Sequence, residues 1–230
     1  MSRVKSIGFD GLNSSGKGTQ IRLFGYFLEQ GGIPSIILRG DGTRSGLGRE
    51  DYDPRSEWWK SNYEFLLDKS DNPIEKLNLQ YQRLAREYRI VRKRVEKSWG
   101  RSVIILDRSY VSRYFTLKQF IPQISMEASL KSYNPKNGEF IPPIIPDRTI
   151  ILKVPKSSLI ERLLKKEDLR SPRGKAVINI IEKNYDLFME ILLELEGRKD
   201  IVIIDGDRDE KDINNEIIRF YEHETKGTLP

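Results

Sequence analysis

One glycine-rich segment near the N-terminus constrains the fold more than any other feature of the sequence. Residues 11–19 read GLNSSGKGT, follow the apolar segment 4–9 and precede a stretch whose apolar residues recur with helical spacing. Glycine lets a backbone wrap closely around an anion, and a following helix adds the positive end of its dipole. A strand, this loop and a helix in that order predict a phosphate-binding loop, in which Lys17 reaches the outer phosphates of a nucleoside triphosphate.

The predicted phosphate contacts all belong to this glycine-rich loop. They are Gly11, Asn13, Ser14, Ser15, Gly16, Lys17, Gly18 and Thr19.

Apolar segments of strand length alternate with helical patterns along the rest of the chain. Strands are predicted at 4–9, 35–38, 103–106, 149–154 and 201–204, and the longest helix carries apolar residues from Ile74 to Val95. Strands separated by helices form crossover units. We therefore predict one α/β domain over residues 1–230, with a three-layer α/β/α P-loop NTPase fold and a five-stranded, mostly parallel sheet. Residues 40–57 are interpreted as a loop, and five prolines between Pro122 and Pro146 argue against regular structure in the second half of that stretch.

Composition excludes several classes of protein. The chain has no cysteine and a single histidine, His223, so disulfides and cysteine metal sites are ruled out and a histidine-centred hydrolase is disfavoured. No signal peptide is evident, and no segment approaches the roughly 20 apolar residues that span a bilayer. We expect a cytoplasmic protein without a membrane partner. The net charge of +6 suits nucleic-acid binding or an enzyme that handles several phosphates, and we expect small nucleotides rather than nucleic acid.

A second motif, Asp107-Arg108-Ser109, ends the apolar strand at 103–106. A carboxylate placed there, beside a phosphate-binding loop, is suited to hold Mg²⁺ directly or through water. Arg108 can direct two N–H groups at one phosphate. The alternative is a surface ion pair.

A third motif is the basic segment at about 162–175, which is predicted to form a small lid. Pro172 and Gly174 are expected to break its helix, and its arginines include Arg170 and Arg173. A mobile lid of this kind can close over a transferred phosphoryl group and exclude water. A solvated charged hairpin is the alternative.

A fourth feature is a helix face with Tyr81, Gln82, Arg86 and Arg89. An aromatic ring can stack on a base, and glutamine offers a donor and an acceptor to a base edge. Equally, Tyr81 lies on the apolar stripe of that helix and can simply belong to the core.

Taken in order, these motifs resemble thymidylate kinases over nearly the whole chain. The run FDGLNSSGKGTQIRLFGYFLEQGGI is similar to the opening of that family, and Asp107-Arg108 with Ser112 matches its Asp-Arg motif. The spacing from Lys17 to Arg39, the step Leu47-Gly48, the run 146–152 and the run 204–206 are also similar.

The resemblance implies an ATP-dependent nucleoside monophosphate kinase, most similar to one acting on dTMP and commonly a homodimer. ATP and Mg²⁺ are the implied cofactors, with Lys17 and Thr19 on the ATP phosphates and Asp107 organising Mg²⁺. Arg108, Arg170 and Arg173 join Lys17 as implied catalytic residues. The implied acceptor side comprises Asp10, Arg39, Asp41, Arg44, Tyr81, Gln82, Arg86, Arg89, Arg108 and Ser112.

Three parts of the sequence depart from the family pattern, and one of them comprises Ser45-Gly46 and the stretch Asp51–Trp59, which contains two tryptophans. Gly18 replaces the serine or threonine expected on Mg²⁺, as in the similar G-K-G-T of adenylate kinases, and Asn13 replaces an acid. These differences leave two alternatives. The run DRSYVSRYF, with Tyr81-Gln82 and Arg89, is similar to deoxyribonucleoside kinases, for which Asp41 is the one nearby candidate base. The other alternative is a nucleotide-binding regulator without kinase activity.

Overall fold

The computed structural model describes residues 5–39, 44–46, 72–98, 102–133, 140–141, 144–166 and 172–226. The predictions at Asp41, at Leu47-Gly48 and at Arg170 fall outside these residues.

A mostly parallel β-sheet forms the centre of the molecule. Its strands are β1 (Lys5–Gly11), β2 (Ser35–Arg39), β3 (Arg44–Gly46), β4 (Val103–Asp107), β7 (Arg148–Lys153) and β8 (Ile201–Asp205), in the order β3-β2-β4-β1-β7-β8. Five of them pair in parallel, which confirms the predicted α/β class and all five predicted strands. β3 is an addition, because it pairs antiparallel with β2 inside the segment that we had interpreted as a loop.

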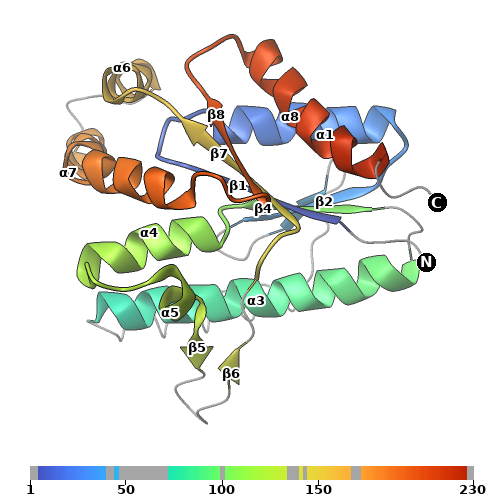
Figure 1. Cartoon of the computed structure of the whole chain (residues 1–230), viewed down its shortest axis with the longest axis horizontal. Helices are drawn as coiled ribbons and strands as arrows, with labels where there is room; N and C mark the ends of the chain where they lie inside the picture. The colour runs from blue at the N-terminus through green and yellow to red at the C-terminus, as the bar shows by residue number, and fades with distance from the viewer. Residues whose placement is uncertain are drawn as a thin grey trace.

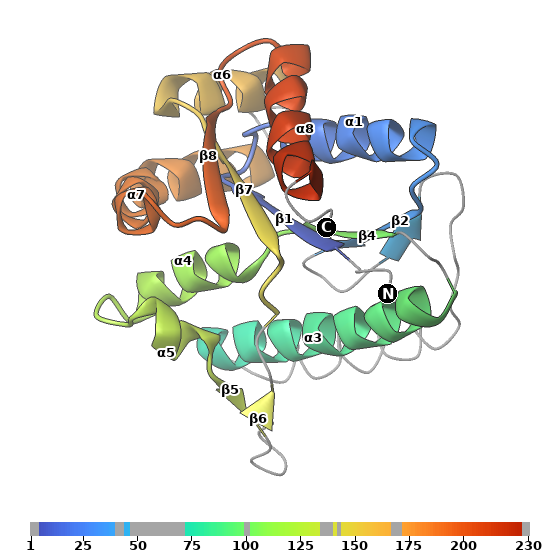
Figure 2. The ribbon, with the colours of Figure 1, turned by 45° about the vertical axis from the view of Figure 1, so that its right-hand side comes forward.

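Helices cover both faces of this sheet (Figures 1 and 2). α1 (Lys17–Gln30) and α8 (Glu210–Lys226) lie on one face, whereas α3 (Pro73–Ser98) and α4 (Tyr110–Phe120) lie on the other. The near-continuous apolar runs of β4 and β7 follow from this arrangement, since a strand covered on both faces has no solvated side. None of the helices in the described segments is long and apolar enough to cross a bilayer.

The core is divided between the two faces. Ile21, Phe24 and Leu28 of α1 pack with Ile213 and Ile217 of α8 against one face of the sheet. On the opposite face, α3 packs against Leu38, Ile104 and Leu106. These helices hold the carboxyl ends of β1, β2 and β4 side by side, where ligands bind in open parallel sheets.

Two local predictions are corrected by the structure. Pro172 begins α7 (Pro172–Leu195) rather than breaking a helix, as suits a residue whose missing N–H is unpaired in a first turn anyway, and Gly174 lies inside that helix. The basic segment is therefore mostly the end of α6 (Lys156–Lys166) and the start of α7. The proline-rich stretch also contains regular structure, namely α5 (Met126–Leu130) and a small antiparallel pair, β5 (Ser132–Tyr133) and β6 (Phe140–Ile141).

Candidate functional site

The glycine-rich loop connects β1 to α1 through left-handed backbone. Gly11 and Gly16 have φ angles of 140° and 93°, and Ser14 has a φ of 63°. A Cβ on Gly11 would lie 2.7 Å from the Ser15 hydroxyl and 2.8 Å from the Leu152 carbonyl oxygen. Glycine is thus required at position 11 by both conformation and space, as the sequence pattern predicts.

Gly16 is the N-cap of α1, and no described side chain caps that terminus. The amide N–H groups of the first helical turn therefore lack the usual side-chain acceptor. Together with the positive end of the helix dipole, this arrangement favours an anion at the loop.

The ammonium group of Lys17 turns back over the loop. Its Nζ donates to the carbonyl oxygens of Gly11, at 2.7 Å, and Leu12, at 2.9 Å. Burial, reinforced by the positive charge of Arg108, lowers the pKa of Lys17 to about 8 from its ordinary 10.5, against the opposing effect of Asp107 and Asp10. A buried amine with a depressed pKa gains most from an anionic partner, because such a partner restores the charged form.

Asp107 and Arg108 lie at the carboxyl end of β4, facing the loop. The strand register aligns Asp107 with Phe9 of β1 on one side and with Arg39 of β2 on the other. Arg108 has a φ of 81°, which is a strained conformation for a side chain of this size, and its Nη2 donates to Asn13 Oδ1 at 2.9 Å. The predicted motif and the loop therefore meet, and Asn13 is one of the contacts between them.

These residues surround a pocket of about 400 Å³, which we name the Asp107 pocket. It is lined by Asn13, Ser14, Ser15, Gly16, Lys17, Gly18, Thr19, Arg22, Asp107 and Arg108. Arg22, one helical turn beyond the loop, was missed from the sequence, and its spacing of three residues from Thr19 is the signal that could have found it.

The Asp107 pocket suits Mg²⁺ better than a metal that needs several protein ligands. Asp107 is the one carboxylate in the lining, and no cluster of three or more metal-ligating side chains occurs among the described residues. Mg²⁺ is usually held by one or two carboxylates together with substrate phosphates and water. Gly18 adds no hydroxyl, and a Cβ built there would meet nothing within 4 Å.

Asp10 lies beneath the loop and is fully buried. Its carboxylate accepts hydrogen bonds from the backbone N–H groups of Ser109, at 3.2 Å, and Ser112, at 3.1 Å, and from both of their hydroxyls. The predicted acceptor-side residues Asp10 and Ser112 therefore bind each other. The contact fixes the start of α4, and with it the backbone of Arg108.

A second pocket, of about 240 Å³, opens on the other side of the glycine-rich loop, and we name it the Gly206 pocket. It shares Ser14, Ser15, Gly16 and Thr19 with the Asp107 pocket and adds Gln20, Arg162, Lys165, Gly206, Arg208, Glu210 and Ile213. Of these additions, Gln20, Arg208, Glu210 and Ile213 were not singled out in the sequence. Positions so far apart along the chain carry no local signal that they line one pocket.

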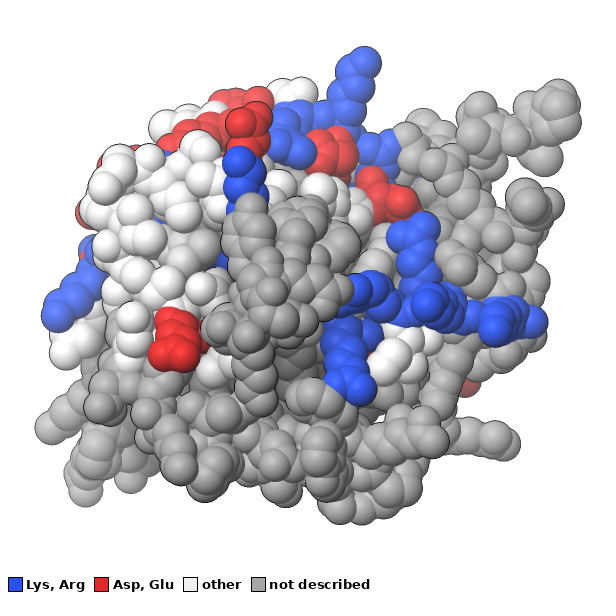
Figure 3. Space-filling view, turned by 90° about the horizontal axis from the view of Figure 1, so that it is seen from below, with Lys and Arg blue, Asp and Glu red and all other residues white. Residues whose placement is uncertain are grey.

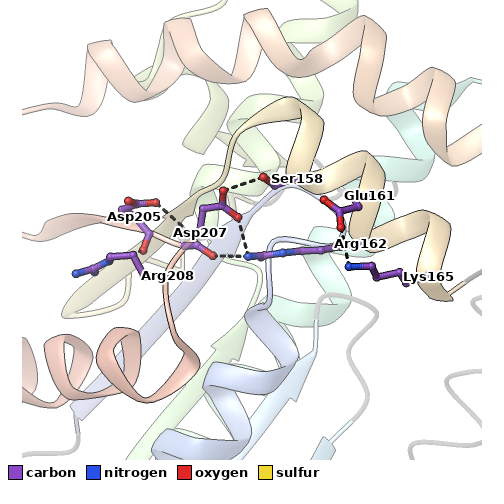
Figure 4. Close-up of polar contacts among 8 residues, drawn as sticks. Ser158, Glu161, Arg162, Lys165, Asp205, Asp207 and Arg208 are labelled. Carbon is purple, nitrogen blue, oxygen red and sulfur yellow. Dashed lines mark hydrogen bonds and ion pairs between the residues drawn. The ribbon is translucent and has the colours of Figure 1, made fainter.

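Arg162 lines the Gly206 pocket and is held by polar contacts with the β8–α8 connection (Figure 4). Its Nη2 donates to the Gly206 carbonyl oxygen at 2.9 Å and to Asp207 Oδ1 at 3.0 Å, while the other oxygen of Asp207 accepts from Ser158 at 2.7 Å. Asp207 thus ties α6 to the β8–α8 connection. Among the described side chains of the predicted lid segment, Arg162 approaches the loop, since its Nη1 would lie 4.0 Å from a Cβ on Gly16.

The predicted base-binding helix face lies apart from both pockets. Tyr81 is buried in the α3 core, where its hydroxyl accepts from Ile144 N at 2.6 Å and its ring lies 4.1 Å from the Arg113 guanidinium. Arg86 and Arg89 are exposed, Gln82 is half-buried, and none of the three lines either pocket. Figure 3 shows basic side chains gathered on this face. Among the described side chains of α3, the exposed basic ones are Arg86, Arg89, Arg92, Lys93 and Lys97.

The remaining predicted residues are placed only in part. Arg39 ends β2 in an exposed position, and Arg44 begins β3, where the backbone register aligns it with Leu38. Arg173 lies in the first turn of α7, and its side chain is outside the described part of the structure.

Comparison with known proteins adds no identification. No protein-family model matches the sequence, and no curated protein matches it either. The function is therefore argued from the site itself.

Proposed function

We propose that this protein is an ATP-dependent kinase that transfers the γ-phosphoryl group to a (deoxy)nucleoside monophosphate, in the manner of a thymidylate kinase. One observation carries the proposal. The glycine-rich loop, with buried Lys17 at the start of α1, faces Asp107 and Arg108 across one pocket at the carboxyl ends of β1 and β4. Donors for phosphate, a magnesium-holding carboxylate and a second cation are the parts that phosphoryl transfer needs.

In the proposed reaction, an oxygen of the acceptor phosphate forms a bond to the γ-phosphorus of ATP. The bond from that phosphorus to the β–γ bridging oxygen breaks, and ADP leaves. Charge spreads over the oxygens of the transferred group during this step, and Lys17 and Arg108 neutralise it from two sides. The first-turn N–H groups of α1 hold the phosphates that stay with ADP.

Mg²⁺ would be held by Asp107, directly or through water, and by the donor phosphates. It would supply further positive charge to the transferred group. Because Gly18 has no hydroxyl, the protein would depend on Asp107 and water for this contact.

The acceptor is proposed to be a phosphate rather than a sugar hydroxyl. A sugar hydroxyl needs a general base, and among the described residues Asp107 is the sole carboxylate that lines the Asp107 pocket. The candidate base Asp41 lies outside the described residues. Asp10 is nearby, but its oxygens are already bound to the start of α4. A monophosphate is ionised at neutral pH, needs no base, and matches the exposed cations Arg22, Arg39 and Arg108.

The proposal is tested by mixing the protein with ATP, Mg²⁺ and a panel of nucleosides and nucleoside monophosphates, and measuring ADP. We expect ADP formation with at least one monophosphate, most of all with dTMP or a close analogue. Turnover with nucleosides alone would favour a deoxyribonucleoside kinase instead. No turnover with any acceptor would refute a kinase.

A nucleotide-binding protein without transferase activity is the second candidate, and Gly18 favours it because the usual magnesium-binding hydroxyl is missing. Under this alternative, ATP binds in the presence of Mg²⁺ and no acceptor yields ADP. Calorimetric titration with ATP beside the turnover panel separates the two functions.

A further inference from the structure

The positive charge of the chain is concentrated in one segment. Residues 83–101 contain eight lysines or arginines and two glutamates, a surplus of six that equals the net charge of the whole protein. Elsewhere in the chain, therefore, basic and acidic residues balance. Most of this segment forms the second half of α3. The sequence led us to expect that the charge serves small nucleotides, but none of the described residues of this segment lines the Asp107 pocket or the Gly206 pocket.

Four exposed cations of this segment form a row along α3, which we name the α3 stripe. They are Arg86, Arg89, Lys93 and Lys97. Their spacing of three or four residues places them on one face of the helix, over roughly 16 Å of its length. Figure 3 shows Lys and Arg side chains gathered at the surface on this side of the molecule. Like charges at this spacing repel each other along a helix, so the α3 stripe does not stabilise the helix that carries it.

The cations of the α3 stripe differ from other surface cations in their partners. Lys165 and Arg208 each pair with a glutamate. In contrast, Arg89, Lys93 and Lys97 form no ion pair with any carboxylate that the structure describes, and Nε of Arg89 donates to a carbonyl oxygen of its own helix at 3.3 Å. The helix dipole favours a lysine in the last turn, but its effect does not reach the cations one or two turns earlier. These three cations therefore keep their attraction for an external anion.

The surroundings of the α3 stripe favour a nucleic-acid backbone over a membrane or a protein. A helix that lies on a membrane needs an apolar face beside its cations, and a protein interface needs apolar or aromatic anchors. The apolar face of α3 packs into the core, and none of the exposed large apolar side chains in the described segments belongs to this helix. A row of cations without apolar neighbours matches the row of phosphates along a nucleic-acid strand. Without an exposed aromatic side chain among its described residues, α3 has no platform on which a base could stack.

We propose that the α3 stripe binds the phosphate backbone of a nucleic acid without reading its bases. The inference goes beyond the proposed kinase, because the stripe lies apart from both pockets. The test measures fluorescence anisotropy of two short labelled DNA duplexes of different sequence, at salt concentrations from about 0.05 to 0.2 M. We expect equal affinities for the two duplexes within about twofold, and a slope near −3.6 for the logarithm of the association constant against the logarithm of the salt concentration, as roughly four phosphate contacts provide.

A double variant, Lys93→Gln with Lys97→Gln, removes two charges from the α3 stripe. We expect it to weaken duplex binding roughly 50-fold at about 0.1 M salt and to reduce the size of the salt slope by about two. The matched control is Lys183→Gln with Lys211→Gln, which removes two exposed lysines from α7 and α8. Because it changes the net charge by the same amount, it separates the stripe from the overall charge of the protein, and it should bind as the wild type does.

No binding of either duplex at the lowest salt concentration would overturn the inference. Equal losses in the two double variants would also overturn it, because binding would then follow net charge alone. A preference of more than about tenfold for one duplex would contradict contact with the backbone only. Binding to vesicles that contain anionic lipid, without binding to DNA, would replace the nucleic acid by a membrane surface. ADP formation is measured separately, so duplex binding that the stripe variant weakens would support the inference even if the kinase were refuted.

Discussion

The two pockets share one loop, but the cations that line them have different kinds of partner. In the Asp107 pocket, Lys17 bonds to carbonyl oxygens and Arg108 to the amide of Asn13, and neither forms an ion pair with a described carboxylate. In the Gly206 pocket, every cation is paired with an acid. A cation that is bonded only to neutral oxygens still attracts an anion. A cation that is paired with a carboxylate is neutralised and is held in one position. From this difference we expect the Asp107 pocket to bind a charged group and the Gly206 pocket to select a group by its shape.

Removing the amine of Lys17 is the most severe test of the role of the Asp107 pocket, and it is expected to have the largest effect. We expect Lys17→Ala to lower turnover by at least about 10³-fold, because the charge that meets the phosphates is lost from a buried position. ADP formation under saturating ATP measures the effect, and a thermal melt shows whether the variant still folds. Lys183→Ala, an exposed lysine of α7, is the matched control. Turnover within tenfold of wild type would remove Lys17 from the mechanism.

Substituting one arginine in each pocket tests whether the two pockets bind different substrates. We expect Arg108→Ala to lower kcat and raise the KM of the acceptor, so that kcat/KM for the acceptor falls about 100-fold, with little change in the KM of ATP, since a charge-assisted contact to a phosphate is lost. Arg162→Ala should raise the KM of ATP about tenfold and leave the acceptor unaffected. Steady-state kinetics with each substrate varied in turn measures both.

Because Arg108 has a positive φ, Arg108→Gly is the better-folded companion variant and should show the same change in KM. Equal effects of Arg108→Ala on both substrates would contradict the division between the pockets.

Asp10 supports the Asp107 side of the loop, because its hydrogen bonds fix the start of α4. Asp10→Asn replaces a buried carboxylate that accepts from two backbone N–H groups and two hydroxyls with an amide that accepts at one oxygen. We expect the free energy of unfolding to fall by about 2–3 kcal/mol, because hydrogen bonds to a charged group are lost in the interior. Urea denaturation measures the change, with the exposed Asp212→Asn as control. A loss below about 0.5 kcal/mol would show that α4 does not depend on this carboxylate.

Because the pKa of Lys17 is lowered, we expect ATP binding in the Asp107 pocket to be accompanied by proton uptake that depends on pH. At pH 9 its amine is mostly neutral in the free protein, since its pKa is about 8. A bound polyphosphate raises that pKa, so ATP binding at pH 9 should take up part of a proton, whereas binding at pH 7.5 should take up less. Calorimetry in two buffers of different ionisation enthalpy measures the uptake. No difference between the two pH values would argue against a contact between Lys17 and phosphate.

The same shift predicts the direction of a stability change. Between pH 8 and 10.5 the unfolded chain binds more protons at Lys17 than the folded protein does. The contribution of Lys17 to stability therefore rises with pH across this window, as the cost of burying a charged amine disappears.

The sequence predicted the parts of this molecule that depend on local pattern. Five apolar runs became the five parallel strands, and the glycine spacing located Gly11 and Gly16, which adopt the positive φ angles that glycine favours. Residues directly after strands, such as Asp107 and Arg108, were brought to the loop by the parallel topology.

What the sequence could not give depends on partners far apart in the chain. Asp10 and Ser112 are 102 residues apart, and Gln20 and Glu210 are 190 apart, so neither contact leaves a periodic or local signal. Tyr81 lies on an apolar stripe that fits a base contact and a core position equally well, and its placement became clear only with the sheet beneath it. Pro172 was interpreted as a helix breaker, although proline is also favoured at a first helical position.

The smallest expected effect concerns Gly18, where the loop departs from the kinase pattern. A Cβ at this position meets nothing within 4 Å, so Gly18→Ser should fold normally and gain up to about 0.5 kcal/mol of helix stability. Its hydroxyl would add a magnesium ligand on the Asp107 side of the loop, and we expect the Mg²⁺ concentration for half-maximal turnover to fall several-fold. Gly18→Ala is the matched control, because it adds the Cβ without the hydroxyl and gives a gain in helix stability at least as large as that of serine. If both variants lower the Mg²⁺ requirement equally, the effect comes from the helix and not from the metal. If only the serine variant lowers it, the missing hydroxyl is what leaves Asp107 and water to hold Mg²⁺ in this protein.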